Sequence, residues 1–126
     1  MKKILIVDDV EGWRNHHKEV VEELIDDAEI FTAECAQQAY DLMLKGIPFD
    51  YILTDLQMET TYEPKYAGEW LVEQIKTFNR YKTTKVVIIS AAYNVRYIAE
   101  NLGVECIPKS TAIKCISAYK EIFGVV

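Results

Sequence analysis

Residues 4–9 read Ile-Leu-Ile-Val-Asp-Asp, a continuous apolar run that ends in a pair of carboxylates. A run without polar alternation is typical of a strand covered on both faces, as in a parallel sheet. Comparable runs occupy residues 51–53, 86–89 and 104–107. Glu105 and Cys106 interrupt the last of these runs. Residues 28–33 are mixed in character and are predicted to form an edge strand.

Between these runs, apolar residues recur with the spacing of an amphipathic helix. The first three stripes are Trp13, His17, Val20, Val21 and Leu24; then Ala36, Ala39, Tyr40 and Met43; then Leu71, Ile75 and Phe78. A fourth helix is predicted over residues 93–101, closed by Gly103. A fifth is predicted from the stripe Ala112, Ile116, Tyr119 and Phe123, with Ser110 or Thr111 as its N-cap.

The predicted order is therefore strand then helix, repeated along the chain. Such alternation implies right-handed crossovers onto a parallel sheet with helices on both faces, an α/β fold. A chain of 126 residues fits one compact domain, and we expect residues 1–126 to form it. The long irregular stretch at residues 59–67 is predicted to be a loop after the third strand.

Composition and charge exclude several classes of protein. A net charge of −6 argues against a nucleic-acid-binding surface, because such binding neutralises phosphates with Lys and Arg. The 3 cysteines have no C-x-x-C spacing, which disfavours a disulfide framework or a zinc site and favours the cytoplasm. No stretch approaches the ~20 apolar residues of a membrane helix. We therefore expect a cytoplasmic protein that binds neither nucleic acid nor membranes.

Polar residues lie where the predicted strands end. Asp8 and Asp9 end the first strand, Asp55 ends the third, Ser90 ends the fourth, and Lys109 follows the last. The carboxyl ends of parallel strands share one edge of the sheet, where open α/β folds bind their ligands. Clustered carboxylates repel one another, and a hard divalent cation such as Mg²⁺ relieves that repulsion with oxygen ligands. The sequence therefore predicts a Mg²⁺ site at this edge.

The same residues suit phosphoryl chemistry. A carboxylate beside a metal ion and an ammonium group can act as a nucleophile that forms an acyl phosphate. We assign that role to Asp55, which stands alone at its strand end, whereas the adjacent Asp8 and Asp9 can share a cation. Lys109 supplies a positive charge to a phosphoryl oxygen, and Ser90 can donate a hydrogen bond to another.

This ordered set of strand-end residues resembles the receiver domain of two-component response regulators, over residues 2 to about 123. The resemblance implies a flavodoxin-like, doubly wound, five-stranded parallel sheet of order 2-1-3-4-5 with five helices. It also implies that a histidine kinase or phosphotransfer protein phosphorylates Asp55, and that an unknown downstream protein reads the result. By the same resemblance, Asp9, Asp55 and the backbone carbonyl of Gln57 bind Mg²⁺ directly, and Asp8 acts mainly through water.

The chain departs from the family pattern at three places. Glu59 replaces the usual proline, and Gly68 comes several residues late, so residues 59–67 form an extra loop. That loop could shade the site, alter the phosphoryl lifetime or form a partner surface. Cys106 replaces the usual switch aromatic, and Ser110 replaces the proline that usually follows the lysine. These changes predict an altered readout of phosphorylation.

Other interpretations remain open beside this one. The acid pair could merely cap a helix N-terminus. His16 and His17 are adjacent and so lack the i, i+4 spacing of a helical metal pair, which predicts one surface and one partly buried histidine. Trp13 and Trp70 are predicted to serve packing.

Two rival functions also remain. One is a small Mg²⁺-dependent phosphatase with an Asp nucleophile, disfavoured because Gln57 stands where such enzymes place a general acid. The other is a receiver-like interaction module that works without phosphorylation. The favoured prediction is a stand-alone receiver that catalyses only its own phosphorylation and dephosphorylation, with output through protein–protein contacts.

Overall fold

Five parallel strands form a single sheet in the computed structural model, which describes residues 1–125. The strands are β1 (Lys2–Val7), β2 (Ala28–Ala33), β3 (Tyr51–Thr54), β4 (Lys85–Ser90) and β5 (Glu105–Pro108). Their order across the sheet is β2-β1-β3-β4-β5, and every pairing is parallel. The predicted doubly wound order is confirmed, as is the edge position of β2.

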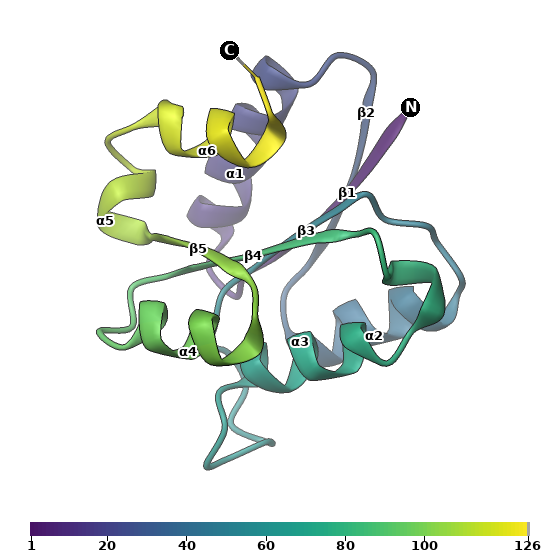
Figure 1. Ribbon diagram of the computed structural model, residues 1–126, viewed down its shortest axis with the longest axis vertical. Helices are drawn as coiled ribbons and strands as arrows, with labels where there is room; N and C mark the ends of the chain where they lie inside the picture. The colour runs from purple at the N-terminus through teal and green to yellow at the C-terminus, as the bar shows by residue number, and fades with distance from the viewer. Residues whose placement is uncertain (126) are drawn as a thin grey trace.

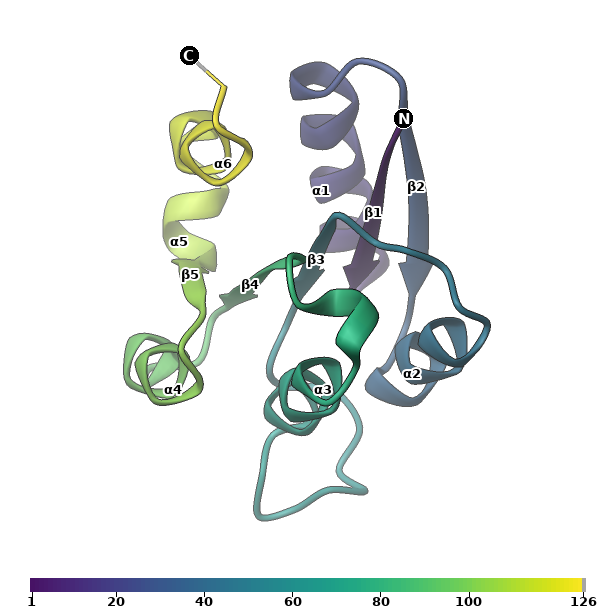
Figure 2. The same ribbon diagram turned by 45° about the vertical axis from the view of Figure 1, so that its right-hand side comes forward.

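Helices cover both faces of this sheet (Figure 1). They are α1 (Glu11–Leu24), α2 (Ala36–Leu44), α3 (Ala67–Lys76), α4 (Val95–Leu102), α5 (Lys109–Ala112) and α6 (Ile116–Phe123), with a 3-10 turn η1 (Asn79–Tyr81) before β4. Helices α1 and α6 lie together on one face, and α2, α3 and α4 line the other (Figure 2). Within residues 1–125, no helix combines the length and the apolar character needed to span a membrane.

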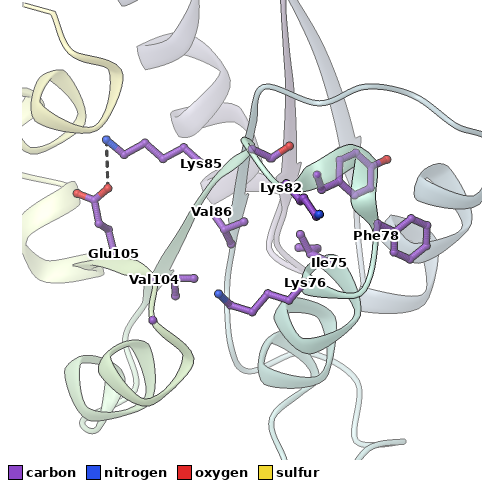
Figure 3. A pocket seen from close by; sticks show the side chains of 11 residues that line it. Ile75, Lys76, Phe78, Lys82, Lys85, Val86, Val104 and Glu105 are labelled. Carbon is purple, nitrogen blue, oxygen red and sulfur yellow. Dashed lines mark ion pairs between the residues drawn. The ribbon is translucent and has the colours of Figure 1, made fainter.

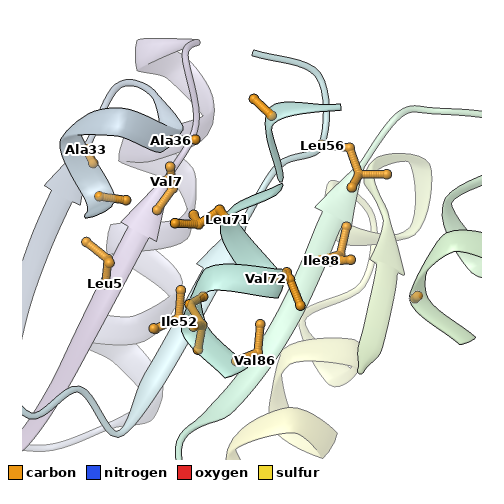
Figure 4. Close-up of a cluster of buried hydrophobic side chains, with 14 of the residues drawn as sticks. Leu5, Val7, Ala33, Ala36, Ile52, Leu56, Leu71, Val72, Val86 and Ile88 are labelled. Atoms are coloured by element: carbon orange, nitrogen blue, oxygen red, sulfur yellow. The ribbon is translucent and has the colours of Figure 1, made fainter. Parts of the chain in front are cut away.

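The continuous apolar runs are divided between two cores. In β1, Leu5 and Val7 pack toward α2, α3 and α4, whereas Ile4 and Ile6 pack toward α1 and α6. Figure 4 shows the first core, where Leu71 and Val72 of α3 meet the apolar side chains of the strands. Successive side chains of a strand point to opposite faces, so a strand with a core on each side must be apolar throughout.

The predicted fifth helix is wrong in one respect, because the structure divides it in two. The chain leaves the helical conformation at Cys115 (φ −140°, ψ 99°), which precedes α6. Ser110 and Thr111 therefore lie inside α5 and are not an N-cap. The stripe misled because Ala112 and the apolar residues of α6 all face the same core, although two separate helices carry them. The break leaves Lys109 at the start of α5, directly after β5.

The loop that joins β3 to α3 is tied to α2 and α3. The Glu59 carboxylate accepts hydrogen bonds from the backbone N–H groups of Ala36 (2.8 Å) and Gln37 (3.0 Å), and so caps the start of α2. The Tyr62 ring stacks on Trp70 of α3, with ring centroids 4.1 Å apart and planes 10° apart. In Figure 1 the loop extends beyond α3, away from the sheet.

Candidate functional site

Three of the predicted site residues meet at the carboxyl edge of the sheet. The Lys109 ammonium lies 3.0 Å from Asp8 Oδ2 and donates a hydrogen bond to Asp55 Oδ2, also at 3.0 Å. The register explains this meeting, because Val7 pairs with Thr54 and places the next residues of β1 and β3 side by side. All three side chains are buried. The predicted convergence of strand ends therefore holds for these three side chains.

Asp8 is a buried carboxylate with an incomplete set of partners. Its Oδ1 accepts a hydrogen bond from the Val10 N–H at 2.9 Å. Its Oδ2 lies 3.0 Å from Lys109 Nζ in an ion pair, and it accepts no hydrogen bond within residues 1–125. Burial raises the pKa of Asp8, and the neighbouring charge of Asp55 raises this pKa further, against the opposing effects of Val10 and Lys109.

Asp55 is held in place by backbone and side-chain hydrogen bonds. Its N–H donates to the Val7 carbonyl at 2.9 Å, and the Thr54 hydroxyl donates to the Asp55 carbonyl at 2.9 Å. Its Oδ1 accepts from the Leu56 N–H at 2.7 Å, while Oδ2 accepts from Lys109. These contacts orient the side chain so that Oδ2 is directed at the ammonium group. Thr54 is a buried strand residue, as predicted.

An acidic triad at this edge can hold a metal ion. Carboxylate oxygens of Asp8, Asp9 and Asp55 lie within 4.8 Å of one another, and Asp9 is exposed to solvent. Asp8 Oδ2 has an ion pair but no hydrogen bond, and the pKa of Asp8 is raised. A divalent cation would relieve both conditions, because such a cation favours the charged carboxylate. The residues therefore fit the predicted metal.

Lys109 is charged in this setting. Burial by itself lowers the pKa of Lys109, but the hydrogen bond and charge of Asp55, followed by the nearby carboxylate of Asp8, outweigh burial and raise this pKa. The face of the Trp13 ring lies 5.0 Å from the ammonium nitrogen, measured to the ring centroid. Trp13 was predicted to serve packing alone, and no signal in the sequence pairs residues so far apart.

Gly68 packs directly against the backbone of Asp55. A Cβ atom at this position would lie 2.0 Å from the Asp55 carbonyl oxygen, and the Gly68 N–H donates to the Leu56 carbonyl at 3.0 Å. The chain thus leaves the site after Asp55, forms the extra loop, and returns to the same backbone at the first turn of α3. Gly68 had been noted only as a displaced landmark of the family pattern.

Ser90 and Gln57 occupy the expected elements. Ser90 ends β4, is fully buried, and pairs in register with Pro108, the residue before Lys109. Its Oγ accepts a hydrogen bond from the Ala92 N–H at 3.1 Å. Gln57 is exposed and follows the nucleophile by two positions. Their roles toward a phosphoryl group and a metal ion stay predictions.

The residues that mark departures from the family pattern have defined places. Cys106 is half-buried on β5, and burial raises the pKa of its thiol. Ser110 lies in α5. His17 is more buried than predicted, with Nδ1 2.8 Å from the Tyr119 hydroxyl, while half-buried His16 lies 3.3 Å from the Ala112 carbonyl.

A large hollow of about 700 Å³ lies elsewhere, at the amino edge of the sheet (Figure 3). Lys76, Lys82 and Lys85 line it together with apolar residues that include Ile75, Val86 and Val104. Lys85 pairs with Glu105 at 3.1 Å. None of the predicted site residues lines this hollow, so it is not where the acidic triad acts.

Comparisons with known proteins identify the family. The family model described as "Response regulator receiver domain" matches residues 4–117. A search of curated proteins found no match.

Solved structures show the same fold at low sequence identity. A CheY-like response regulator receiver domain from Methylobacillus flagellatus is 22% identical, with a TM-score of 0.79 and coverage of 98% of this chain and 97% of that chain. The Mn(2+)-bound form of response regulator Rcp1 is 20% identical, with a TM-score of 0.79 and coverage of 98% and 94%. Chemotaxis protein CheY4 of Vibrio cholerae is 20% identical, with a TM-score of 0.77 and coverage of 100% and 99%.

The fold, the acidic triad and the buried lysine agree with the family match. Receiver domains are signalling domains rather than true enzymes, and histidine kinases phosphorylate them. Because the family model covers most of the sequence, this chain belongs to the receiver-domain family of two-component response regulators.

Proposed function

We propose that this protein is a phosphorylation-controlled switch in which Asp55 accepts a phosphoryl group from a histidine kinase or a phosphotransfer protein. The observation that carries this proposal is the buried ammonium of Lys109, 3.0 Å from both Asp8 Oδ2 and Asp55 Oδ2. Two negative charges share one positive charge there, which leaves the site ready for a further cation. A phosphoryl group brought in with that cation completes the charge balance.

The transfer proceeds by attack of an Asp55 carboxylate oxygen on the phosphorus atom of the donor. The new bond is the P–O bond of an acyl phosphate, and the P–N bond of the donor phosphohistidine breaks. The electron pair of that bond stays on the imidazole, which takes up a proton. Positioning and charge stabilisation account for most catalysis in phosphoryl transfer, so fixed partners around Asp55 matter more than acid–base groups.

Mg²⁺ is the expected cofactor. Asp9, Asp55 and the Gln57 carbonyl would bind it, and Asp8 would act mainly through water, as the family resemblance implies. When bound, the ion neutralises charge on the transferred oxygens. Lys109 neutralises another part of that charge, and Ser90 can donate a hydrogen bond to a phosphoryl oxygen. Relative Rcp1 binds Mn²⁺, which supports a divalent ion here as well.

Output through a downstream protein follows from this proposal, with the chain acting as a single cytoplasmic receiver. A phosphoryl group adds charge and three acceptor oxygens, which can bias a local conformational equilibrium. Ser90 and α4 are the first candidates to respond. A phosphoryl mimic with Mg²⁺ should shift the backbone amide signals of residues 90–107 in NMR spectra. Unchanged signals there would contradict this route of output.

The deciding experiment is incubation with Mg²⁺ and acetyl phosphate, followed by intact-protein mass measurement. We expect a gain equal to one phosphoryl group in the wild type and none in Asp55→Asn. Asp26→Asn is the matched control, because Asp26 is exposed at the end of α1 far from the triad, and it should be phosphorylated normally. A mass gain that persists in Asp55→Asn would disprove the assignment.

A further inference from the structure

The ammonium group of Lys109 has three N–H bonds, and the carboxylates account for two of its neighbours. Asp8 Oδ2 and Asp55 Oδ2 each lie 3.0 Å from Nζ. A third neighbour is the Trp13 ring, whose centroid lies 5.0 Å from the same nitrogen. Lys109 is 8% exposed, so little of its surface is left for water. An indole face attracts a cation most strongly among the aromatic side chains, and more so when the pair is desolvated.

The Trp13 ring packs against a cluster of aromatic side chains, with an edge-on contact to His16 and a tilted contact to His17. It lies in the first turn of α1, with ring centroids 5.5 Å from those of both His16 and His17. His17 is buried and forms a hydrogen bond with the Tyr119 hydroxyl of α6 at 2.8 Å. The ring is therefore supported by α1 and α6 together, on the face of the sheet opposite α2, α3 and α4. A ring held in this way can define where the ammonium group sits.

We propose that Trp13 is a positioning residue for phosphoryl transfer, because its indole face holds the Lys109 ammonium between Asp8 and Asp55. This inference rests on the proposed function of Asp55 and adds a residue that the ordered acidic and basic set does not contain. Without the ring, water would occupy the third side of the ammonium group. The lysine would then spend part of its time away from the nucleophile, and transfer would slow because it depends on prior placement of charge.

The expected effects follow the order of cation–π strength. Trp13→Leu removes the π face but keeps an apolar side chain, and should slow phosphorylation of Asp55 by acetyl phosphate between roughly twofold and thirtyfold. Trp13→Phe keeps a weaker π face, and its phosphorylation rate should fall between those of Trp13→Leu and wild type. The loss should appear in the maximal rate more than in the acetyl phosphate concentration that gives half of this rate, because Lys109 is misplaced rather than absent.

A second measurement tests the contact without phosphorylation. In NMR spectra of the metal-free protein, the Lys109 side-chain protons near the indole face should carry an upfield ring-current shift. This shift should shrink in Trp13→Phe and vanish in Trp13→Leu. Trp70→Phe is the matched control, because Trp70 stacks on Tyr62 of the loop between β3 and α3 and should change neither the Lys109 shift nor the rate. Urea unfolding of each variant shows that it remains folded.

The outcomes separate this inference from the proposed function. A wild type that takes up no phosphoryl group overturns both. A wild type that is phosphorylated, with Trp13→Leu folded and equally fast, overturns only the role of Trp13. Equal rates in Trp13→Phe and Trp13→Leu, both below wild type, would show that indole packing rather than the π face matters, and this also overturns the proposal. If Trp13→Leu fails to fold, the phosphorylation rate and the ring-current shift of Trp13→Phe decide between the outcomes.

Discussion

At the scale of single residues, Lys109 supplies the positive charge that pairs with both Asp8 and Asp55. One ammonium serves two buried carboxylates, and burial raises the pKa of Asp8 while Asp8 and Asp55 together raise the pKa of Lys109. Each group therefore depends on the others for its charge state. A cation or phosphoryl group that binds beside Asp8, Asp55 and Lys109 changes the charge around all three groups at once. The positions of these side chains should therefore respond to the charge of the ligand.

Gly68 sets the position of Asp55 through sterics, and Gly68→Ala tests this. The new Cβ would lie 2.0 Å from the Asp55 carbonyl oxygen, a backbone atom that no side-chain rotation can move. We expect the free energy of unfolding to fall by about 1–3 kcal/mol, with slower phosphorylation of Asp55. Gly12→Ala is the control, since nothing lies within 4 Å of its new Cβ and alanine favours the α1 helix. Urea unfolding that shows equal stability for Gly68→Ala and wild type would contradict this account.

The residues of the site could be predicted from sequence where their position on a strand determined them. Asp8, Asp55 and Lys109 follow strands of one parallel sheet, so the order of elements alone brings them together. Trp13 and Gly68 could not be found in this way. Their roles depend on a ring-to-ammonium distance and on a close backbone approach, which arise only when α1 and α3 are packed on the sheet.

At the scale of elements, the glutamate that replaces the usual proline at position 59 has a structural role, because it caps α2. Cys35 precedes α2 and makes no side-chain cap, so the first N–H groups of that helix need another acceptor. Glu59 supplies it from the loop after β3, two residues beyond Gln57. The extra loop therefore has a structural role between the site and α2. Sequence could predict the loop but not this contact, which joins two distant segments.

The α1–α6 contact predicts a particular dependence of stability on pH. Burial is the main reason that the pKa of His17 is lowered to about 3, from 6.5 in the unfolded chain. Between these values the unfolded state binds a proton that the folded state does not. Stability is therefore fully present above pH 6.5 and falls as the pH drops toward 3, with a slope of up to about 1.4 kcal/mol per pH unit.

Substitution of His17 isolates this effect from that of other groups. His17→Gln is neutral at every pH and should show a shallower fall in the free energy of unfolding between pH 6.5 and about 3, measured by urea unfolding. His16→Gln keeps the buried imidazole and its Tyr119 partner, and should retain most of the steep fall, because burial lowers the pKa of His17 more than the charge of His16 does. Parallel curves for His17→Gln and wild type would contradict a neutral, buried His17.

At the scale of the whole molecule, each of the two helical layers contributes a residue to the carboxyl edge of the sheet. The layer of α1 and α6 supplies Trp13 and the aromatic residues behind it, whereas α3 presses Gly68 against the nucleophile from the other layer. Both layers thus contact the phosphoacceptor region. Continuous apolar strands predicted these layers, but the division of the last helix into α5 and α6 was missed because both segments face one core.

The charged carboxylate of Asp8 should lower the free energy of unfolding of the metal-free protein and raise the gain in stability on Mg²⁺ binding. The folded-state pKa of Asp8 is raised, so the charged form of this carboxylate destabilises the metal-free fold near neutral pH. Asp8→Asn should therefore be more stable than wild type without metal. Wild type should gain about 2.7 kcal/mol when free Mg²⁺ is a hundredfold above its Kd, and Asp8→Asn should gain less. Urea unfolding with and without Mg²⁺ measures both effects, and exposed Asp26→Asn should match wild type in each. A lower metal-free stability of Asp8→Asn would mean that its ion pair with Lys109 outweighs burial and repulsion by Asp55.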